Sequence, residues 1–126
     1  AERLRDFLKA LPGGYRYAFE FRDPSWFTAK INGLLKDRNA ACCIYDFNGR
    51  QSPRTVTADF VYIRLHGPGG AYEGRYGTVT LQQWTERIHK WRSSGNTVYC
   101  YFDNDQAGYA AMNAKELRDM VDGEMQ

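Results

Sequence analysis

Short apolar segments alternate with amphipathic ones along the whole chain, and this alternation restricts the fold more than any other feature. Leu4, Phe7, Leu8 and Leu11 follow a helical spacing, which Pro-Gly-Gly at 12–14 ends. The aromatic segment that follows is predicted to be extended. The same alternation continues to the end of the chain. It predicts four strands, at 15–22, 41–46, 60–66 and 97–102.

The predicted helices carry recognisable end signals. Ser25 is predicted to cap a helix with an apolar inner face after the first strand. Thr80 and Gln83 have capping-box spacing ahead of another amphipathic segment, which Gly95 ends. A last helix follows the fourth strand, and 48–58 shows no helical pattern.

This order of elements predicts an α/β fold, with parallel strands covered by outer helices. The four βα units form a single domain over residues 1–126. Four such strands fit two architectures: a small open sheet, or half of a TIM-type (β/α)8 barrel.

Composition excludes several classes of protein. The 17 basic and 15 acidic residues are too evenly balanced to indicate a nucleic-acid partner by bulk charge. No apolar stretch is long enough to span a bilayer, and the amphipathic start resembles no signal peptide. The three cysteines fit neither a disulfide framework nor a zinc site. We therefore expect a cytoplasmic protein with no membrane partner, and the sequence indicates no metal or cofactor.

Polar side chains follow the end of each predicted strand. In parallel α/β folds, ligands bind at the carboxyl ends of the strands. The two-residue period of a strand puts Arg64 and His66 on one face, and Glu20 and Arg22 on one face. The side chains predicted to meet at this edge are Glu20, Arg22, Asp46, Arg64, His66, Asp103 and Asp105.

Three segments resemble the YecE-like family, a bacterial family of uncharacterised function. They are FEFRDPSWF at 19–27, YIRLHGPGGAYEGRY at 62–76 and VYCYFDNDQAGYAAMNAKEL at 98–117. Members of that family are similar to TIM barrels and are about twice as long. The resemblance therefore implies the carboxyl-terminal half of a TIM-type barrel, strands five to eight. The residues that it implies fall on the three family motifs are Glu20, Arg22, Ser25, Trp26, Arg64, His66, Gly67, Tyr72, Tyr76, Tyr101, Phe102, Asp103, Asn104, Asp105, Gly108 and Asn113.

The candidate catalytic residues are His66, Glu20 and Asp46. The ordinary pKa of histidine suits proton transfer near neutral pH. Glu20 or Asp46 would orient His66 or act as a second acid or base, while Arg22 and Arg64 would hold a carboxylate or phosphate. Structural roles remain possible for Glu20, Arg22 and Asp46. Glu20 and Arg22 could neutralise each other as an ion pair, and Asp46 could cap the following turn.

The loop 67–77 contains five glycines and two tyrosines, and it is predicted to close over the site as a lid. Its tyrosines could contact a ligand through rings and hydroxyls. Asp103 and Asp105 have a second interpretation, as caps of the last helix. The further predicted ligand contacts are Trp26, Tyr72, Tyr76, Asp103 and Asp105.

Three functions fit these residues. The first is a site for a small anionic molecule, phosphorylated or carboxylated, with acid/base chemistry. The alternative is a nucleic-acid-binding or phosphodiester-acting barrel, in which Trp26, Tyr72 and Tyr76 stack on bases. A further alternative is a non-catalytic interaction protein.

Four strands of a barrel leave two open edges and an uncovered inner face. We predict that this face carries Ala18, Ile44, Ile63 and Tyr99 beside the polar cluster. The chain is then expected either to be a fragment or to pair with another half, a missing amino-terminal half or a second copy.

Overall fold

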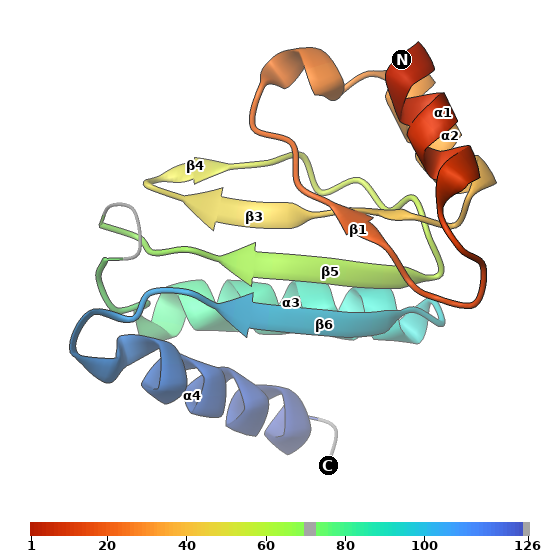
Figure 1. Ribbon diagram of the computed structural model, residues 1–126. Helices are drawn as coiled ribbons and strands as arrows, with labels where there is room; N and C mark the ends of the chain where they lie inside the picture. Colours follow the sequence, from red (N-terminus) through yellow and green to blue (C-terminus); the bar gives the residue numbers. More distant parts are fainter. Residues whose placement is uncertain (70–72, 125–126) are drawn as a thin grey trace.

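The computed structural model describes residues 1–69 and 73–124, and its strands form a β1–β2 pair and a sheet of order β4-β3-β5-β6 (Figure 1). The elements are α1 (Glu2–Ala10), β1 (Ala18–Phe19), η1 (Pro24–Trp26), α2 (Ala29–Asp37), β2 (Ala41–Cys42), β3 (Ile44–Phe47), β4 (Arg50–Gln51), β5 (Phe60–Leu65), α3 (Thr78–Ser93), β6 (Thr97–Phe102), η2 (Gln106–Gly108) and α4 (Tyr109–Glu124).

The parallel pairing of the four predicted strands is confirmed. β1 pairs with β2, β3 pairs with β5, and β5 pairs with β6, all in parallel. β2 and β3 together form the second predicted strand, interrupted at Cys43, whose N–H donates to the Phe19 carbonyl at 2.7 Å. The described strands form an open arrangement and not a closed barrel.

One strand was not predicted. β4 pairs antiparallel with β3 after a tight turn at Asn48 and Gly49, whose φ angles are +52° and +77°. An Asn-Gly pair favours this kind of turn, because both residues tolerate positive φ. The connection from β3 to β5 therefore contains a hairpin and an extended segment, with no helix at 48–58.

Two predicted helix caps are wrong. The Thr28 hydroxyl, not that of Ser25, caps α2 by accepting from the Ile31 N–H at 3.2 Å. Ser25 lies instead in the short η1 turn that precedes α2. α3 begins at Thr78, so Thr80 lies inside the first turn and cannot cap it.

Two apolar cores hold the elements together. The larger lies between the sheet and helices α3 and α4, which cover one face of it (Figure 1), and includes Ile63, Leu65 and the fully buried Trp84. The smaller joins α1 and α2 to the β1–β2 pair, around Leu8 and Leu35. No helix among the described residues has both the length and the apolar character needed to cross a membrane.

The face of the sheet turned away from α3 and α4 is called the inner face here. In β5 it carries Tyr62 and Arg64, because Val61, Ile63 and Leu65 pack into the larger core. The prediction of Ile44 and Ile63 on the inner face is therefore wrong: both contact the helices. The rings actually found there include Tyr62, Tyr99 and Tyr101, with ring centroids 5.3 to 6.5 Å apart.

Candidate functional site

Five charged or titratable side chains meet on the inner face at the carboxyl ends of the strands. Arg64 lies one residue before the end of β5 at Leu65, and His66 follows directly after that end on the same face as Arg64. The segment after β1 brings Glu20 and Arg22, and the end of β6 brings Asp103. The ionic cluster is named from here on by these members: Glu20, Arg22, Arg64, His66 and Asp103.

His66 is buried between the two carboxylates of this cluster. Its Nε2 lies 3.3 Å from Glu20 Oε1, and its Nδ1 lies 3.2 Å from Asp103 Oδ2. Nε2 also lies 3.3 Å from Arg22 Nη2. With its proton on Nδ1, the ring can accept the Arg22 hydrogen bond at Nε2.

Arg64 and Arg22 each bind a carboxylate. Arg64 donates to Asp103 Oδ2 from Nε at 3.1 Å and Nη2 at 2.5 Å, and to Glu20 Oε1 from Nη1 at 3.3 Å. Arg22 donates to Glu20 Oε2 from Nε at 2.7 Å. Two guanidiniums thus balance two carboxylates within the cluster.

Aromatic rings support the Arg22 guanidinium. Its central carbon lies 4.2 Å from the centre of the Phe47 ring and 4.8 Å from that of Tyr45. Phe47 also contacts His66 edge to face, with ring centroids 5.6 Å apart. Because these contacts restrain Arg22, its donors keep a fixed direction although 42% of its side chain is exposed.

The environment shifts the pKa of two members. Burial raises the pKa of Glu20, but the hydrogen bond and charge of Arg22, together with His66, outweigh it, so the pKa lies below its usual value. Burial lowers the pKa of Arg64, but its hydrogen bond to Asp103 and the nearby carboxylates raise it further, for a net increase. Glu20 and Arg64 therefore stay ionised across the neutral range.

A cavity of about 230 Å³ adjoins the cluster on the inner face. It is lined by Ala18, Glu20, Cys43, Tyr62 and Arg64. Cys43 is not among the predicted site residues, yet its thiol lies 3.5 Å from Glu20 Oε1. Alternation could have found it, because Cys43 shares a face with Tyr45, the register partner of Arg64.

Asp46 does not join the ionic cluster. Its register partner is Leu65, so its side chain lies on the helix-facing side of the sheet. There the Tyr76 hydroxyl donates to Asp46 Oδ2 at 2.8 Å and accepts from the Gly67 N–H at 2.9 Å. Burial raises the pKa of Asp46, although Tyr76 and His66 partly oppose this. The structure thus gives Asp46 a contact that fixes the chain after β5.

Part of the predicted lid is firmly attached. The Tyr76 N–H and carbonyl both bond to the buried Asn113 side chain, at 2.9 and 3.1 Å. The buried Asn104 side chain donates to Asn113 Oδ1 at 2.9 Å and to the Gly74 carbonyl at 2.8 Å. These hydrogen bonds hold residues 74–76 against α4, so this part of the predicted lid is fixed in place.

The remaining predicted ligand contacts lie elsewhere. Trp26 stacks on Phe21, with ring centroids 4.7 Å apart, and packs against the smaller core. Tyr76 is buried, and Asp105 precedes η2 without a side-chain cap bond. Tyr72 lies outside the described residues. Two of the three rings on which the nucleic-acid alternative depended are therefore occupied by packing.

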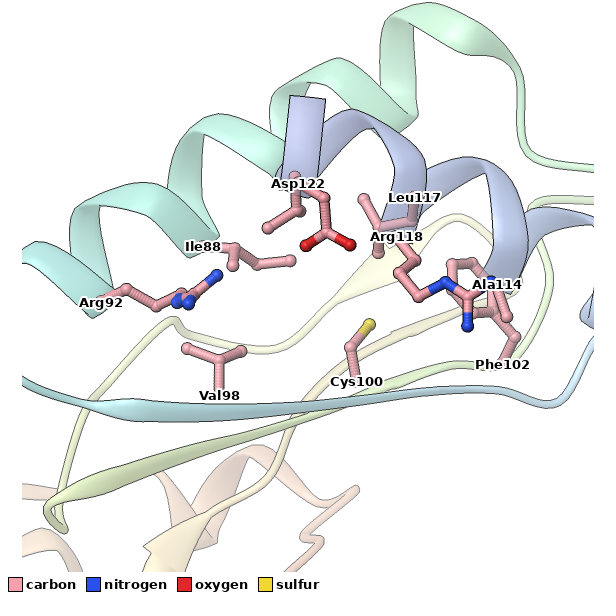
Figure 2. Close-up of a pocket in the computed structure, with 10 residues that line it drawn as sticks. Ile88, Arg92, Val98, Cys100, Phe102, Ala114, Leu117, Arg118 and Asp122 are labelled. Atoms are coloured by element: carbon pink, nitrogen blue, oxygen red, sulfur yellow. The ribbon is translucent and has the colours of Figure 1, made fainter. Parts of the chain in front are cut away.

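A second cavity lies on the other side of β6, between α3 and α4 (Figure 2), with a volume of about 330 Å³. Ile88, Val98 and Leu117 give it apolar walls, and Cys100 lies among them. None of the described candidate catalytic or ligand-contact residues lines this cavity. Over the described residues, no group of three or more His, Cys, Asp or Glu side chains is placed to hold a metal ion.

Comparison with known proteins identifies the family. Residues 1–126 match the family described as "Protein of unknown function DUF72". The chain belongs to the DUF72 family. A comparison with curated proteins finds no match.

Solved structures of DUF72 proteins share the fold. A DUF72 family protein from Thermotoga maritima is similar over 96% of this chain, with a TM-score of 0.83 and 24% identity. Two crystal structures of a DUF72 family protein from Enterococcus faecalis are similar over 96% of this chain, with TM-scores of 0.76 and 0.73 and identities of 21% and 23%. This chain covers 51% of the first protein and 51% and 53% of the other two, so it spans about half the length of these DUF72 proteins.

Proposed function

We propose that this DUF72 chain is the carboxyl-terminal half of a YecE-like TIM-type barrel, with a site for a small carboxylated or phosphorylated molecule at the ionic cluster. The strand pairing supports the half-barrel, because the parallel pairs β1–β2, β3–β5 and β5–β6 follow the order of the four predicted strands along the chain. The relatives' length supports it too, since this chain covers about half of each.

The observation that carries the proposed site is the position of His66. A buried imidazole between two carboxylates, with two partly exposed guanidiniums beside it, is equipped to take up a proton and return it. Glu20 and Asp103 would stabilise the charged ring, while the ionised Glu20 would serve as a second base. Asp46 has no part in this chemistry.

Arg22 and Arg64 would hold the anion. Their side chains are 42% and 35% exposed. Each guanidinium has five N–H donors, more than the contacts with Glu20 and Asp103 use. A carboxylate or phosphate would accept the remaining donors in a bidentate geometry. Its negative charge would also stabilise the protonated form of His66.

Thermal unfolding with a panel of small carboxylates and phosphomonoesters tests the proposed site. A ligand that binds only the folded chain raises its unfolding temperature. We expect at least one such anion to do so, and Arg22→Gln to remove the effect. Arg50→Gln is the matched control, because Arg50 is exposed on β4 and makes the same change of charge. The proposal fails if no anion stabilises the chain, or if both variants respond like the parent.

Light scattering tests the half-barrel. The inner face of the described chain carries Tyr101, half of which is exposed, beside Tyr62 and Tyr99. We expect the purified 126-residue chain to associate through this face, and Tyr101→Glu to weaken that association. A stable monomer at high concentration would contradict the half-barrel while leaving the ligand test unaffected.

A further inference from the structure

A basic hollow lies against the carboxyl-terminal half of α3, away from the ionic cluster. Its volume is about 520 Å³. Arg87, Lys90 and Trp91 line it from one face of α3, and Ser94, directly after the helix, continues their spacing. Arg54 lines it from the segment between β4 and β5. The β3–β5 connection, which supplies Arg54, forms no helix.

Positive charge gathers in this hollow. Three of its five lining side chains are cations and none is a carboxylate. Arg54 donates to a neutral group, Gln51 Oε1, at 3.2 Å. Lys90 stands in the last turn of α3, where it balances the partial negative charge of the helix end. The two arginines therefore carry the excess charge that an anion would neutralise.

The Arg87 guanidinium is held in place with one buried N–H group that has no hydrogen-bond acceptor among the described residues. Its guanidinium carbon lies 4.6 Å from the centre of the ring of Trp84, which is fully buried. Arg87 Nη1 is itself buried and has no hydrogen-bond partner among the described residues. Burial and the charge of Arg54 lower the pKa of Arg87, with Glu86 opposing them. A buried donor without an acceptor is costly, and a bound anion would remove that cost.

We propose that the basic hollow binds a phosphate group through Arg54, Arg87 and Lys90. A phosphate presents three acceptor oxygens and up to two negative charges, which match three convergent cations better than a single carboxylate does. The Ser94 hydroxyl already donates to the Lys90 carbonyl at 3.2 Å, so the cations are the donors. The phosphate comes either from a small phosphorylated molecule or from the backbone of a nucleic acid.

Calorimetric titration with pyrophosphate and with a single-stranded DNA of about twelve nucleotides, at constant ionic strength, separates these sources. We expect Arg54→Gln to weaken binding about tenfold, the loss typical of one charge-assisted hydrogen bond. Arg87→Met keeps an apolar side chain over Trp84 and should weaken binding by at least as much, with its fold checked by circular dichroism. Lys30→Gln, on the exposed surface of α2, is the control of equal charge and should bind like the parent.

Each outcome decides the matter. Saturable binding of pyrophosphate that is lost in the two hollow variants supports a small phosphorylated ligand. Binding of the oligonucleotide alone, lost in the same variants, supports a nucleic-acid backbone as the source. The proposal is overturned if neither probe binds, or if Lys30→Gln loses as much affinity as Arg54→Gln.

Discussion

Replacing Tyr76 with phenylalanine should destabilise the fold strongly and in a manner that depends on pH. The substitution removes one hydroxyl and keeps the buried ring, which contacts Phe102 edge to face. Two hydrogen bonds are lost: the donation to Asp46 Oδ2 and the acceptance from the Gly67 N–H. Both partners lie in buried surroundings, where water replaces a lost partner poorly.

The two losses add to about 3 kcal/mol near neutral pH. A charge-assisted bond to a buried carboxylate contributes roughly 2 kcal/mol and a backbone N–H bond about 1 kcal/mol. For a domain of this size, that corresponds to a fall of about 10 °C in unfolding temperature. Tyr101→Phe makes the same chemical change on an exposed side chain and should stay within about 0.5 kcal/mol of the parent.

The pH dependence follows from Asp46. Burial raises its folded-state pKa, and the Tyr76 hydrogen bond opposes that increase, so the variant should raise the pKa further. A carboxyl whose pKa is raised by folding keeps its full stability below the unfolded pKa and loses it as pH rises through the folded one. The deficit of Tyr76→Phe should therefore be smaller at pH 4 than at pH 7, because protonation of Asp46 weakens the lost charge-assisted bond while the loss at Gly67 remains.

Urea unfolding followed by circular dichroism, at pH 4 and pH 7, measures both quantities. Equal deficits at the two pH values would refute the role given to Asp46. A deficit below about 0.5 kcal/mol at both would show that neither bond contributes to stability.

Three further predictions concern other parts of the chain. Burial raises the pKa of all three thiols, that of Cys100 to about 12, so a thiol reagent at pH 8 should react at the rate of unfolding. Folding lowers the pKa of Glu20, so its contribution to stability is present above its usual pKa and is lost as pH falls. Glu20→Gln should therefore reduce the loss of stability at acid pH in a stability–pH profile, and an unchanged loss would contradict this. Thr28→Ala should cost about 1 kcal/mol in urea unfolding and Ser25→Ala close to none, whereas equal effects would disprove the assignment of the α2 cap.

The periodicity of the sequence was enough to predict the parallel strands and the helices that cover them. It also placed Arg64 and His66 on one face, because side chains two positions apart in a strand point the same way. The same rule, applied to Asp46, excludes it from the site: Asp46 shares a face with Ile44, which is in the larger core. The error arose because position at a strand end was given more weight than alternation.

Other features depend on contacts between distant segments, which periodicity does not encode. Asp103 was predicted at the site, with a second interpretation as a helix cap. The structure decides between the two, because the Asp103 carboxylate accepts a hydrogen bond from Arg64, 39 positions earlier in the chain. Tyr76 was predicted as a ligand contact because its loop is rich in glycine. Its burial follows from Asn113, which binds its backbone from α4.

The sequential order of the strands also has a consequence for how the chain reaches its folded state. The register partners Ala18 and Ala41, Ile44 and Ile63, and Phe60 and Thr97 are 23, 19 and 37 positions apart. Each strand therefore adds to its predecessor by closing a short stretch of chain, and no pairing waits for the far terminus. Because loop closure costs grow with the length enclosed and folding rates fall with mean contact separation, such a chain can acquire its strands one after another from the amino terminus. A ribosome-bound chain that has emerged only as far as β5 would already contain every partner that β1, β2 and β3 have in the described structure.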